Sequence, residues 1–227
     1  MLTGRRILVT SGPTRAPIDA VRYVANRSSG ALGSRIAVEA LRRGAAVTLI
    51  AGPHSLRPTD AELDDAEGAR LRLVDVVTVD DVIAAVRKAL AGDAPPDAVV
   101  HAMAVLDYVP ADPAAAKTPS GRDEWTVRLV RTPKVVRLIR EWAPAALLVQ
   151  FKLEVGTDEM GLREAALASL MRNGADLVVA NTLEEITAEM HPALIIEPSG
   201  EVIARPGTKD EIAARLCDAI AERLAVR

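Results

Sequence analysis

Ser28, Ser29 and Gly30 stand directly before a stretch of sequence with helical periodicity. That periodicity predicts a helix over residues 29–43, so these residues would lie at its N-terminus. Unpaired N–H groups and the positive end of the helix dipole favour an anion there, above all a phosphate. The alternative is that a serine only caps the helix, while Gly30 and Gly33 let it pack closely on a strand.

Charged and amide side chains gather in the long segment before this helix. Residues 12–28 separate it from a predicted strand at residues 6–11, whereas strand-to-helix loops usually need only about two to six residues. A long loop at this position often carries function, and cations beside a helix N-terminus favour a phosphate site. The polar side chains of the segment include those of Arg15, Asp19, Arg22, Asn26 and Arg27.

Strands and helices alternate along most of the chain, which indicates an α/β fold. We expect a single Rossmann-like domain over residues 1–227, a three-layer sandwich with a mostly parallel central sheet and right-handed crossovers. Ligands of such sheets bind beyond the carboxyl ends of the strands. Predicted strands occupy residues 6–11, 46–51, 71–76, 98–103, 146–153 and 177–180, and a hairpin joins residues 193–196 to 202–204. Predicted helices occupy residues 29–43, 132–142, 158–172 and 209–224, and a further helix ends at Ala91 after a cap at Thr78 or Asp80.

The segment after the fourth of these strands is rich in proline, alanine and polar residues. Its composition predicts a mobile flap or arm over residues 109–123, in which Lys117 is the only lysine. Residues 124–130 alternate like a half-exposed strand. Pro133 would take the first position of the next helix, where proline is favoured. Residues 54–70 are acidic and indicate a solvated surface loop.

The composition excludes several classes of function. The 227 residues carry a net charge of −3, and 49% of them are hydrophobic, which is ample for a core. This charge argues against a nucleic-acid surface and a polybasic membrane anchor, and no apolar run approaches the roughly 20 residues of a membrane span. The single cysteine, Cys217, permits no internal disulfide, fits a cytoplasmic protein and would fill the core. Three scattered histidines make no zinc site.

A dinucleotide-binding enzyme is a natural alternative for such a fold, and the sequence argues against it. The turn after the first strand, residues 11–14, reads Ser-Gly-Pro-Thr and lacks the Gly-x-Gly-x-x-Gly pattern. The second strand ends in residues 51–53, Ala-Gly-Pro, with no acid for a ribose. A P-loop pattern is also absent. These features predict a protein that binds a nucleotide or phosphate through loops unlike those of dinucleotide-binding enzymes and P-loop proteins.

Several blocks of the sequence closely resemble the phosphopantothenate–cysteine ligase family of coenzyme A biosynthesis. Residues 9–19, VTSGPTRAPID, and residues 21–30, VRYVANRSSG, are similar to the opening of that family. Residues 101–108, HAMAVLDY, resemble its Ala-Val-x-Asp-Tyr segment. Further similar blocks follow in the same order at Lys117 and at residues 132–134, 151–154, 175–181 and 208–209. The likeness is to the stand-alone bacterial form, and the chain departs from the family at Pro13, Ala16 and Leu106.

The resemblance implies a reaction and a set of partners. The family joins 4′-phosphopantothenate to L-cysteine, with CTP in most bacteria and ATP in the animal enzymes, and we expect CTP here. The carboxylate attacks the α-phosphate to give an acyl-nucleotide and pyrophosphate, and the cysteine amine then displaces the nucleotide monophosphate. Mg²⁺ would be held through the triphosphate, with no direct side-chain ligand. The family works as a homodimer, and the arm that it implies here spans residues 107–130.

The resemblance also implies roles for individual residues. As catalytic residues, Arg22 would position the anionic substrate, Asn26 would hold the acyl carbonyl, and Lys117 would close over the triphosphate. Arg22, Asn26 and Ala104 are the expected substrate-binding residues. The expected nucleotide-binding residues are Gly12, Ser28, Ser29, Gly30, Ala104, Asp107, Lys117, Phe151 and Lys209.

Some of these roles have simpler alternatives. Asp107 would contact the ribose or only end a turn, and Ala104 and Phe151 would hold the base largely through backbone groups. Asn26 could instead form an Asx-turn, and Lys117 could be a solvated loop lysine. Two other function classes stay open: a non-catalytic nucleotide-binding regulator, which the presence of Asn26 and Lys117 argues against, and an NAD(P)-dependent reductase.

Overall fold

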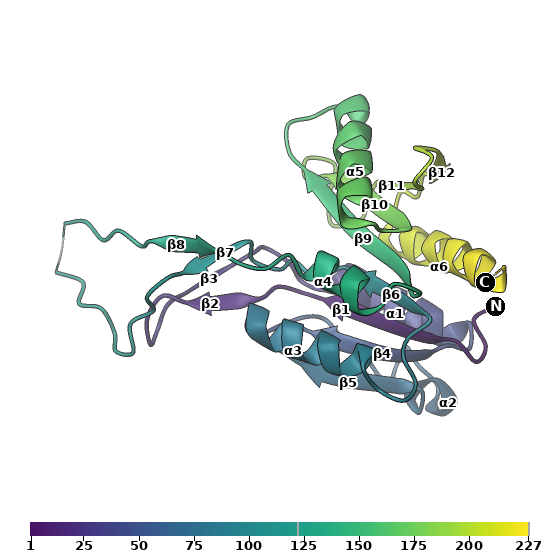
Figure 1. Ribbon diagram of the computed structural model, residues 1–227, viewed down its shortest axis with the longest axis horizontal. Helices are drawn as coiled ribbons and strands as arrows, with labels where there is room; N and C mark the ends of the chain where they lie inside the picture. The colour runs from purple at the N-terminus through teal and green to yellow at the C-terminus, as the bar shows by residue number, and fades with distance from the viewer. Residues whose placement is uncertain (122, 227) are drawn as a thin grey trace.

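The computed structural model describes residues 1–121 and 123–226, which form helical layers on both sides of one sheet (Figure 1). The sheet has eight strands in the order β12-β11-β10-β9-β6-β1-β4-β5. The six strands from β10 to β5 are parallel, and β11 and β12 are antiparallel, which confirms the predicted α/β fold with a mostly parallel sheet. The strands are β1 (Arg6–Ser11), β4 (Ala46–Ala51), β5 (Leu71–Asp75), β6 (Ala98–His101), β9 (Leu147–Glu154), β10 (Leu177–Thr182), β11 (Leu194–Ile196) and β12 (Val202–Ala204).

Side chains of the strands alternate between the two faces of the sheet and build two cores. In β1, Ile7 and Val9 pack with α1 and α6 on one face, whereas Leu8 packs with α3, α4 and α5 on the other. Because both faces are covered, the central strands are apolar along most of their length. The helices are α1 (Ala31–Arg42), α2 (Asp65–Gly68), α3 (Val79–Leu90), α4 (Val135–Trp142), α5 (Glu159–Asn173) and α6 (Lys209–Ala225).

Side-chain caps fix the first residues of α3, α5 and α6. Thr78 Oγ1 accepts a hydrogen bond from the Asp81 N–H at 3.2 Å, so Thr78 and not Asp80 caps α3. The Asp158 carboxylate caps α5 and the Thr208 hydroxyl caps α6 in the same way. Each cap satisfies an N–H that has no partner within its helix. The predicted starts of these helices are therefore confirmed.

Two small hairpins extend from one end of the sheet, opposite both chain termini (Figure 1). The first pairs β2 (Arg15–Pro17) with β3 (Tyr23–Ala25), so the segment expected as a plain loop over residues 12–28 contains a hairpin. The second pairs β7 (Tyr108–Pro110) with β8 (Leu129–Arg131). It closes the base of the arm, which we define as residues 107–130.

Two predicted boundaries around the arm are wrong. Residues 124–130 were expected as a strand, but β8 begins only at Leu129. The next helix was expected to begin at residue 132 with Pro133 in its first turn. Instead α4 begins at Val135, because Lys134 before it keeps an extended backbone. The mobile flap predicted over residues 109–123 includes a position, 122, that lies outside the described residues.

Two further predictions need correction. The helix expected from residue 29 begins at Ala31, since Gly30 has a left-handed backbone with φ of 72° that a helix cannot continue. Residues 54–70, expected as a solvated loop, contain the single turn of α2 and bury Ser55 against the turn after β1. Cys217 is buried as expected, and burial raises the pKa of its thiol to about 12. Among the described residues, no helix has the length and apolar character needed to cross a membrane.

Candidate functional site

The chain segments that follow β1 and β6 stay hydrogen-bonded to each other beyond the strands. The Ala104 N–H donates to Gly12 O at 2.8 Å, and the Thr14 N–H donates to Ala104 O at 3.3 Å. The Leu106 N–H donates to Thr14 Oγ1 at 3.0 Å. In the sheet, β1 has β4 on one side and β6, which comes later in the sequence, on the other. The order of the strands therefore reverses at β1, and ligands of open parallel sheets bind at such a point.

The N-terminus of α1 lies against the turn after β1. No side chain caps this helix, because Gly30 is the N-cap residue. The hydroxyls of Ser28 and Ser29 only accept long hydrogen bonds of 3.4 Å, from the N–H groups of Gly30 and Ala31. Gly12 and Gly30 both approach Ser55 so closely that a Cβ on either would lie within 2.8 Å of its side chain. The helix therefore presents backbone N–H groups, as a phosphate site requires.

Asn26 joins this helix start to the segment after β6. Its carboxamide Nδ2 donates to Ala104 O and to Val105 O, both at 3.2 Å. Asn26 is thus placed beside Ala104, the residue expected to contact substrate and base. The backbone N–H of Ala104 donates to Gly12, and its C=O accepts hydrogen bonds from Thr14 and Asn26.

A buried carboxylate connects Arg22 to the arm. The Asp19 side chain is fully buried and accepts hydrogen bonds from Val21 N, Arg22 N, Nε and Nη2, and Thr118 N, at 2.5 to 3.0 Å. The hydrogen bonds from the Arg22 guanidinium hold the pKa of this carboxyl well below its usual range. Arg22 also donates to Thr118 O at 2.8 Å and lies 4.3 Å above the ring of Trp125.

This network changes the role that the sequence suggested for Arg22. Its charge is compensated by Asp19 and covered by Trp125, so in this structure Arg22 holds the arm instead of presenting a free cation. The arm segment that it holds includes Thr118, the neighbour of Lys117. Lys117 is exposed and has no hydrogen-bond or ion-pair partner within the described residues. The network therefore fixes the backbone position from which the Lys117 side chain extends.

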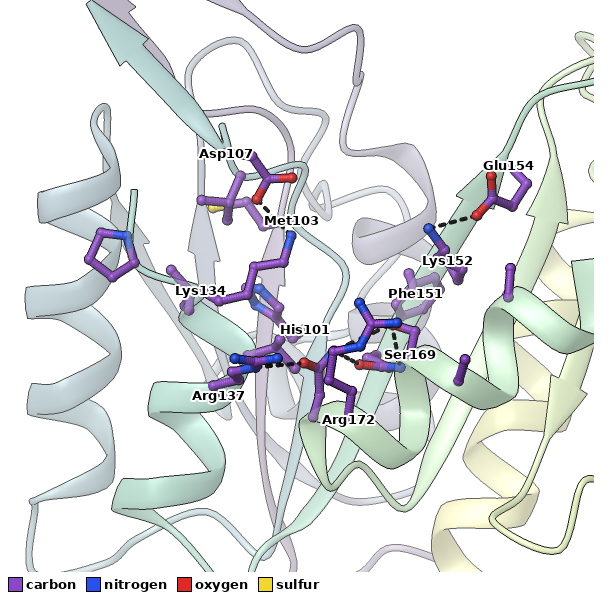
Figure 2. Close-up of a pocket in the computed structure, with 18 of the residues that line it drawn as sticks. His101, Met103, Asp107, Lys134, Arg137, Phe151, Lys152, Glu154, Ser169 and Arg172 are labelled. Carbon is purple, nitrogen blue, oxygen red and sulfur yellow. Dashed lines mark hydrogen bonds and ion pairs between the residues drawn. The ribbon is translucent and has the colours of Figure 1, made fainter. Parts of the chain in front are cut away.

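A cavity of about 370 Å³ opens between α4 and α5 at the carboxyl ends of β6 and β9 (Figure 2). Asp107 and Phe151, both expected in the nucleotide site, line it. Asp107 accepts a hydrogen bond from Lys134 Nζ at 2.6 Å, and Lys152 pairs with Glu154 at 2.7 Å. Lys209, at the start of α6, is not among the residues that line this cavity. It lies near His191, whose pKa falls to about 4 through burial and, second, the Lys209 charge.

His101 and Gln150 are polar residues that the sequence analysis did not assign to the site. Both lie in otherwise apolar strands, and both line the cavity while remaining buried. Burial and, second, the charge of Lys134 lower the pKa of His101 to about 4, so its ring is neutral at pH 7. Its Nδ1 lies 2.8 Å from Thr10 Oγ1. A polar residue inside an apolar strand is the signal that could have found them.

A family model described as the DNA/pantothenate metabolism flavoprotein C-terminal domain matches residues 2–224. The chain belongs to this family. Its relatives include the coenzyme A biosynthesis bifunctional protein CoaBC of Thermococcus kodakarensis, which is 38% identical over 223 residues, 98% of this chain and 52% of that protein. CoaBC of Escherichia coli is 35% identical over 187 residues, 80% of this chain and 42% of that protein. The chain spans about half the length of the curated relatives that it matches.

Solved structures of this family share the fold. The DNA/pantothenate metabolism flavoprotein of Streptococcus pneumoniae has a TM-score of 0.85 and 30% identity over 97% of this chain and 100% of that one. The C-terminal domain of a CoaBC protein has a TM-score of 0.78 and 28% identity over 100% of this chain and 98% of that one. A Cab2 mutant in complex with phosphopantothenate-cysteine has a TM-score of 0.77 at 20% identity, which shows a common fold.

Replacing Asp19 with Asn should destabilise the protein at pH 7, because the change removes the charge that compensates Arg22 and leaves one donor facing another. The pKa of Asp19 is lowered in the folded state, so its contribution to stability is present above the unfolded pKa of about 4 and is lost as pH falls further. Urea unfolding at pH 7 and at pH 3 should therefore show a smaller difference between wild type and variant at pH 3.

Asp112→Asn is the matched control, since Asp112 forms an ion pair with Arg128 in which both side chains are exposed. Exposed pairs contribute little, so its urea midpoint should stay near that of the wild type at both pH values. Equal effects of the two substitutions at pH 7 would contradict the role of Asp19.

Proposed function

We propose that the chain is a phosphopantothenate–cysteine ligase that forms the amide bond between 4′-phosphopantothenate and L-cysteine. Its relatives at 38% and 35% identity are named as coenzyme A biosynthesis proteins, and a protein of the same fold binds phosphopantothenate-cysteine. The structural observation that carries the proposal is the uncapped start of α1, which lies beside Gly12 and the Asn26–Ala104 contact. It offers a phosphate site next to an amide side chain.

In the first step, a carboxylate oxygen of phosphopantothenate attacks the α-phosphorus of the nucleotide, and pyrophosphate leaves. The barrier comes from bringing two anions together, so the protein must neutralise charge more than transfer protons. Ser28, Ser29 and Gly30 bind phosphate oxygens at the start of α1 in this proposal, and Lys117 closes over the triphosphate from the arm. Arg22 positions the arm through Asp19.

In the second step, the cysteine amine attacks the acyl carbon, and the nucleotide monophosphate leaves with the former carboxylate oxygen. Asn26 holds the acyl carbonyl in this step, since its carboxamide already lies beside Ala104. Mg²⁺, when bound, would screen the triphosphate charge. Among the described residues, no group of three or more histidine, cysteine or acidic side chains could hold a metal ion.

The nucleotide extends from the start of α1 into the cavity between α4 and α5. Asp107 contacts the ribose, and Phe151 and Ala104 lie along the base. We favour CTP over ATP as the nucleotide. Lys209 lies outside this cavity, and we leave it out of the proposed contacts.

We also propose that the protein works as a homodimer in the cytoplasm. The two hairpins expose large apolar side chains at one end of the molecule, and such surfaces are typical of protein interfaces. An arm that crosses to a second copy would cover that copy's site. The exposed apolar residues of the hairpins include Val21, Tyr23, Tyr108, Leu129 and Val130.

The purified protein should release pyrophosphate when it is given phosphopantothenate, Mg²⁺ and CTP. Release should need phosphopantothenate, because its carboxylate is the nucleophile, and should be weaker when ATP replaces CTP. A coupled pyrophosphate assay with and without cysteine measures both points. Absence of release with either nucleotide, or release that does not depend on phosphopantothenate, would overturn the proposed function.

Asn26→Asp should keep the first half-reaction and stall the second. The new carboxylate cannot donate a hydrogen bond to the acyl carbonyl, so about one pyrophosphate per site should appear without amide product. Quenched-flow measurement of pyrophosphate, together with mass spectrometry of the amide, separates the two steps. Loss of pyrophosphate release as well would show that Asn26 serves binding or folding, through its hydrogen bonds to Ala104 and Val105.

A further inference from the structure

A second cavity, of about 490 Å³, lies between α3 and the edge strand β5. Its lining includes Arg6 and Ala46, which are the first residues of β1 and β4, so it opens at the amino ends of these strands. The Asn26–Ala104 contact and the cavity between α4 and α5 lie at the carboxyl ends, on the opposite edge of the sheet. The α3–β5 cavity is therefore separate from the place proposed for the ligase reaction.

The register of the strands explains why the sheet is open at this place. Leu8, Thr48 and Arg72 form one row across β1, β4 and β5, and Arg6 pairs with Ala46 two residues earlier. Because side chains alternate along a strand, all five project from the face of the sheet on which α3 packs. Ala46 and Thr48 have small side chains, and they leave a gap on the middle strand between the longer side chains of β1 and β5.

The floor of the α3–β5 cavity is apolar. Leu8 and Ile50 come from the sheet and are only 1% and 0% exposed. Val74 on β5 and Ala85 and Ala89 on α3 line the same space and are partly buried. The apolar part of a ligand would leave water when it lies on this floor, which favours binding.

Four cationic residues line the cavity, and three of them keep donors free. The Arg70 guanidinium is bound by two backbone carbonyls near the end of α1, those of Leu41 and Ala45. Arg6 donates from Nε to a backbone carbonyl at 2.8 Å, which leaves its two Nη groups. Within residues 1–121 and 123–226, the side chains of Arg72 and Lys88 have no hydrogen-bond or ion-pair partner.

The charge of the cavity is opposite to that of the whole chain. Asp93 is the one acidic residue among the described residues that line it, against four cations, whereas the chain has a net charge of −3. A concave site lined by one sign of charge attracts ligands of the other sign. A phosphate monoester carries nearly two negative charges and three strong acceptor oxygens. It can therefore use two arginine forks and a lysine at once.

We propose that the α3–β5 cavity binds a small molecule that carries a phosphate group on an apolar body. The phosphate lies between Arg6, Arg72 and Lys88, and the apolar body lies on the floor formed by Leu8 and Ile50. The simpler alternative is that these cations only protect the open edge of β5 from pairing with other chains. In that case no phosphate compound would bind here saturably.

Titration of ¹⁵N-labelled protein with phenyl phosphate, followed by NMR of the backbone amides, tests the site. The signals of Ala89 and Gly92 should shift saturably, because both residues line the cavity. The signals of Gly12 and Gly30 report separately on the start of α1. Inorganic phosphate should bind more weakly than phenyl phosphate, and phenol should give no saturable shift, since each lacks one of the two parts that the cavity recognises.

Arg72→Gln and Lys88→Gln should each weaken the binding of phenyl phosphate about tenfold, because each removes a charged donor to the phosphate. Both side chains are exposed, so neither change should disturb folding. Arg215→Gln is the matched control. Arg215 is exposed on α6, and its side chain has no hydrogen-bond or ion-pair partner within the described part of the chain. This variant should bind phenyl phosphate as the wild type does.

Three results would each overturn the proposal: shifts confined to Gly12 and Gly30, equal affinities for inorganic phosphate and phenyl phosphate, or wild-type affinity in both Arg72→Gln and Lys88→Gln. The titration contains neither nucleotide nor phosphopantothenate. Its outcome therefore does not depend on the proposed function, and a chain without ligase activity could still show this site.

Discussion

Hydrogen bonds between the segments that follow β1 and β6 are the constraint on which the rest of the site depends. Because the Ala104 N–H pairs with Gly12 O and Leu106 pairs with Thr14, the parallel register of the sheet continues into two loops that would otherwise be free to separate. Asn26 then joins the start of α1 to the same point. The uncapped helix and the cavity between α4 and α5 are thereby held at fixed positions on one edge of the sheet.

A second, buried interaction determines where the arm lies. The Asp19 carboxylate collects N–H groups from its own turn and from Thr118, far away in the sequence, while Arg22 contacts both Asp19 and Trp125. Desolvation of this carboxylate is compensated because nearly all its lone pairs accept hydrogen bonds. In the proposed ligase, the charge of Arg22 serves to hold the arm, and the free cation above the phosphates is that of Lys117. Positioning and charge neutralisation are thus divided between two residues.

The sequence was sufficient to predict the features that depend on the local pattern of apolar and turn-forming residues. The apolar strands and the helix beginnings near Thr78, Asp158 and Thr208 follow from periodicity and turn chemistry, and the structure has them, whereas α1 begins two residues later than predicted. The hairpin of β2 and β3 was missed, because three-residue strands carry too little alternation to be recognised. The hydrogen bond between Asp19 and Thr118 joins positions that lie far apart in the sequence, and periodicity predicts only local structure, so this contact could not be predicted. Gln150 and His101 did leave a signal, since each is a polar residue within a buried strand.

The fate of the carboxylate oxygens tests the central claim most directly, namely that the nucleotide activates phosphopantothenate at its α-phosphate. Phosphopantothenate labelled with ¹⁸O in its carboxylate is converted with cysteine, Mg²⁺ and CTP, and the products are examined by mass spectrometry. The account predicts one ¹⁸O atom in each nucleotide monophosphate, because the amine displaces it together with the oxygen that attacked phosphorus. Label in inorganic phosphate or pyrophosphate, with none in the monophosphate, would contradict the account.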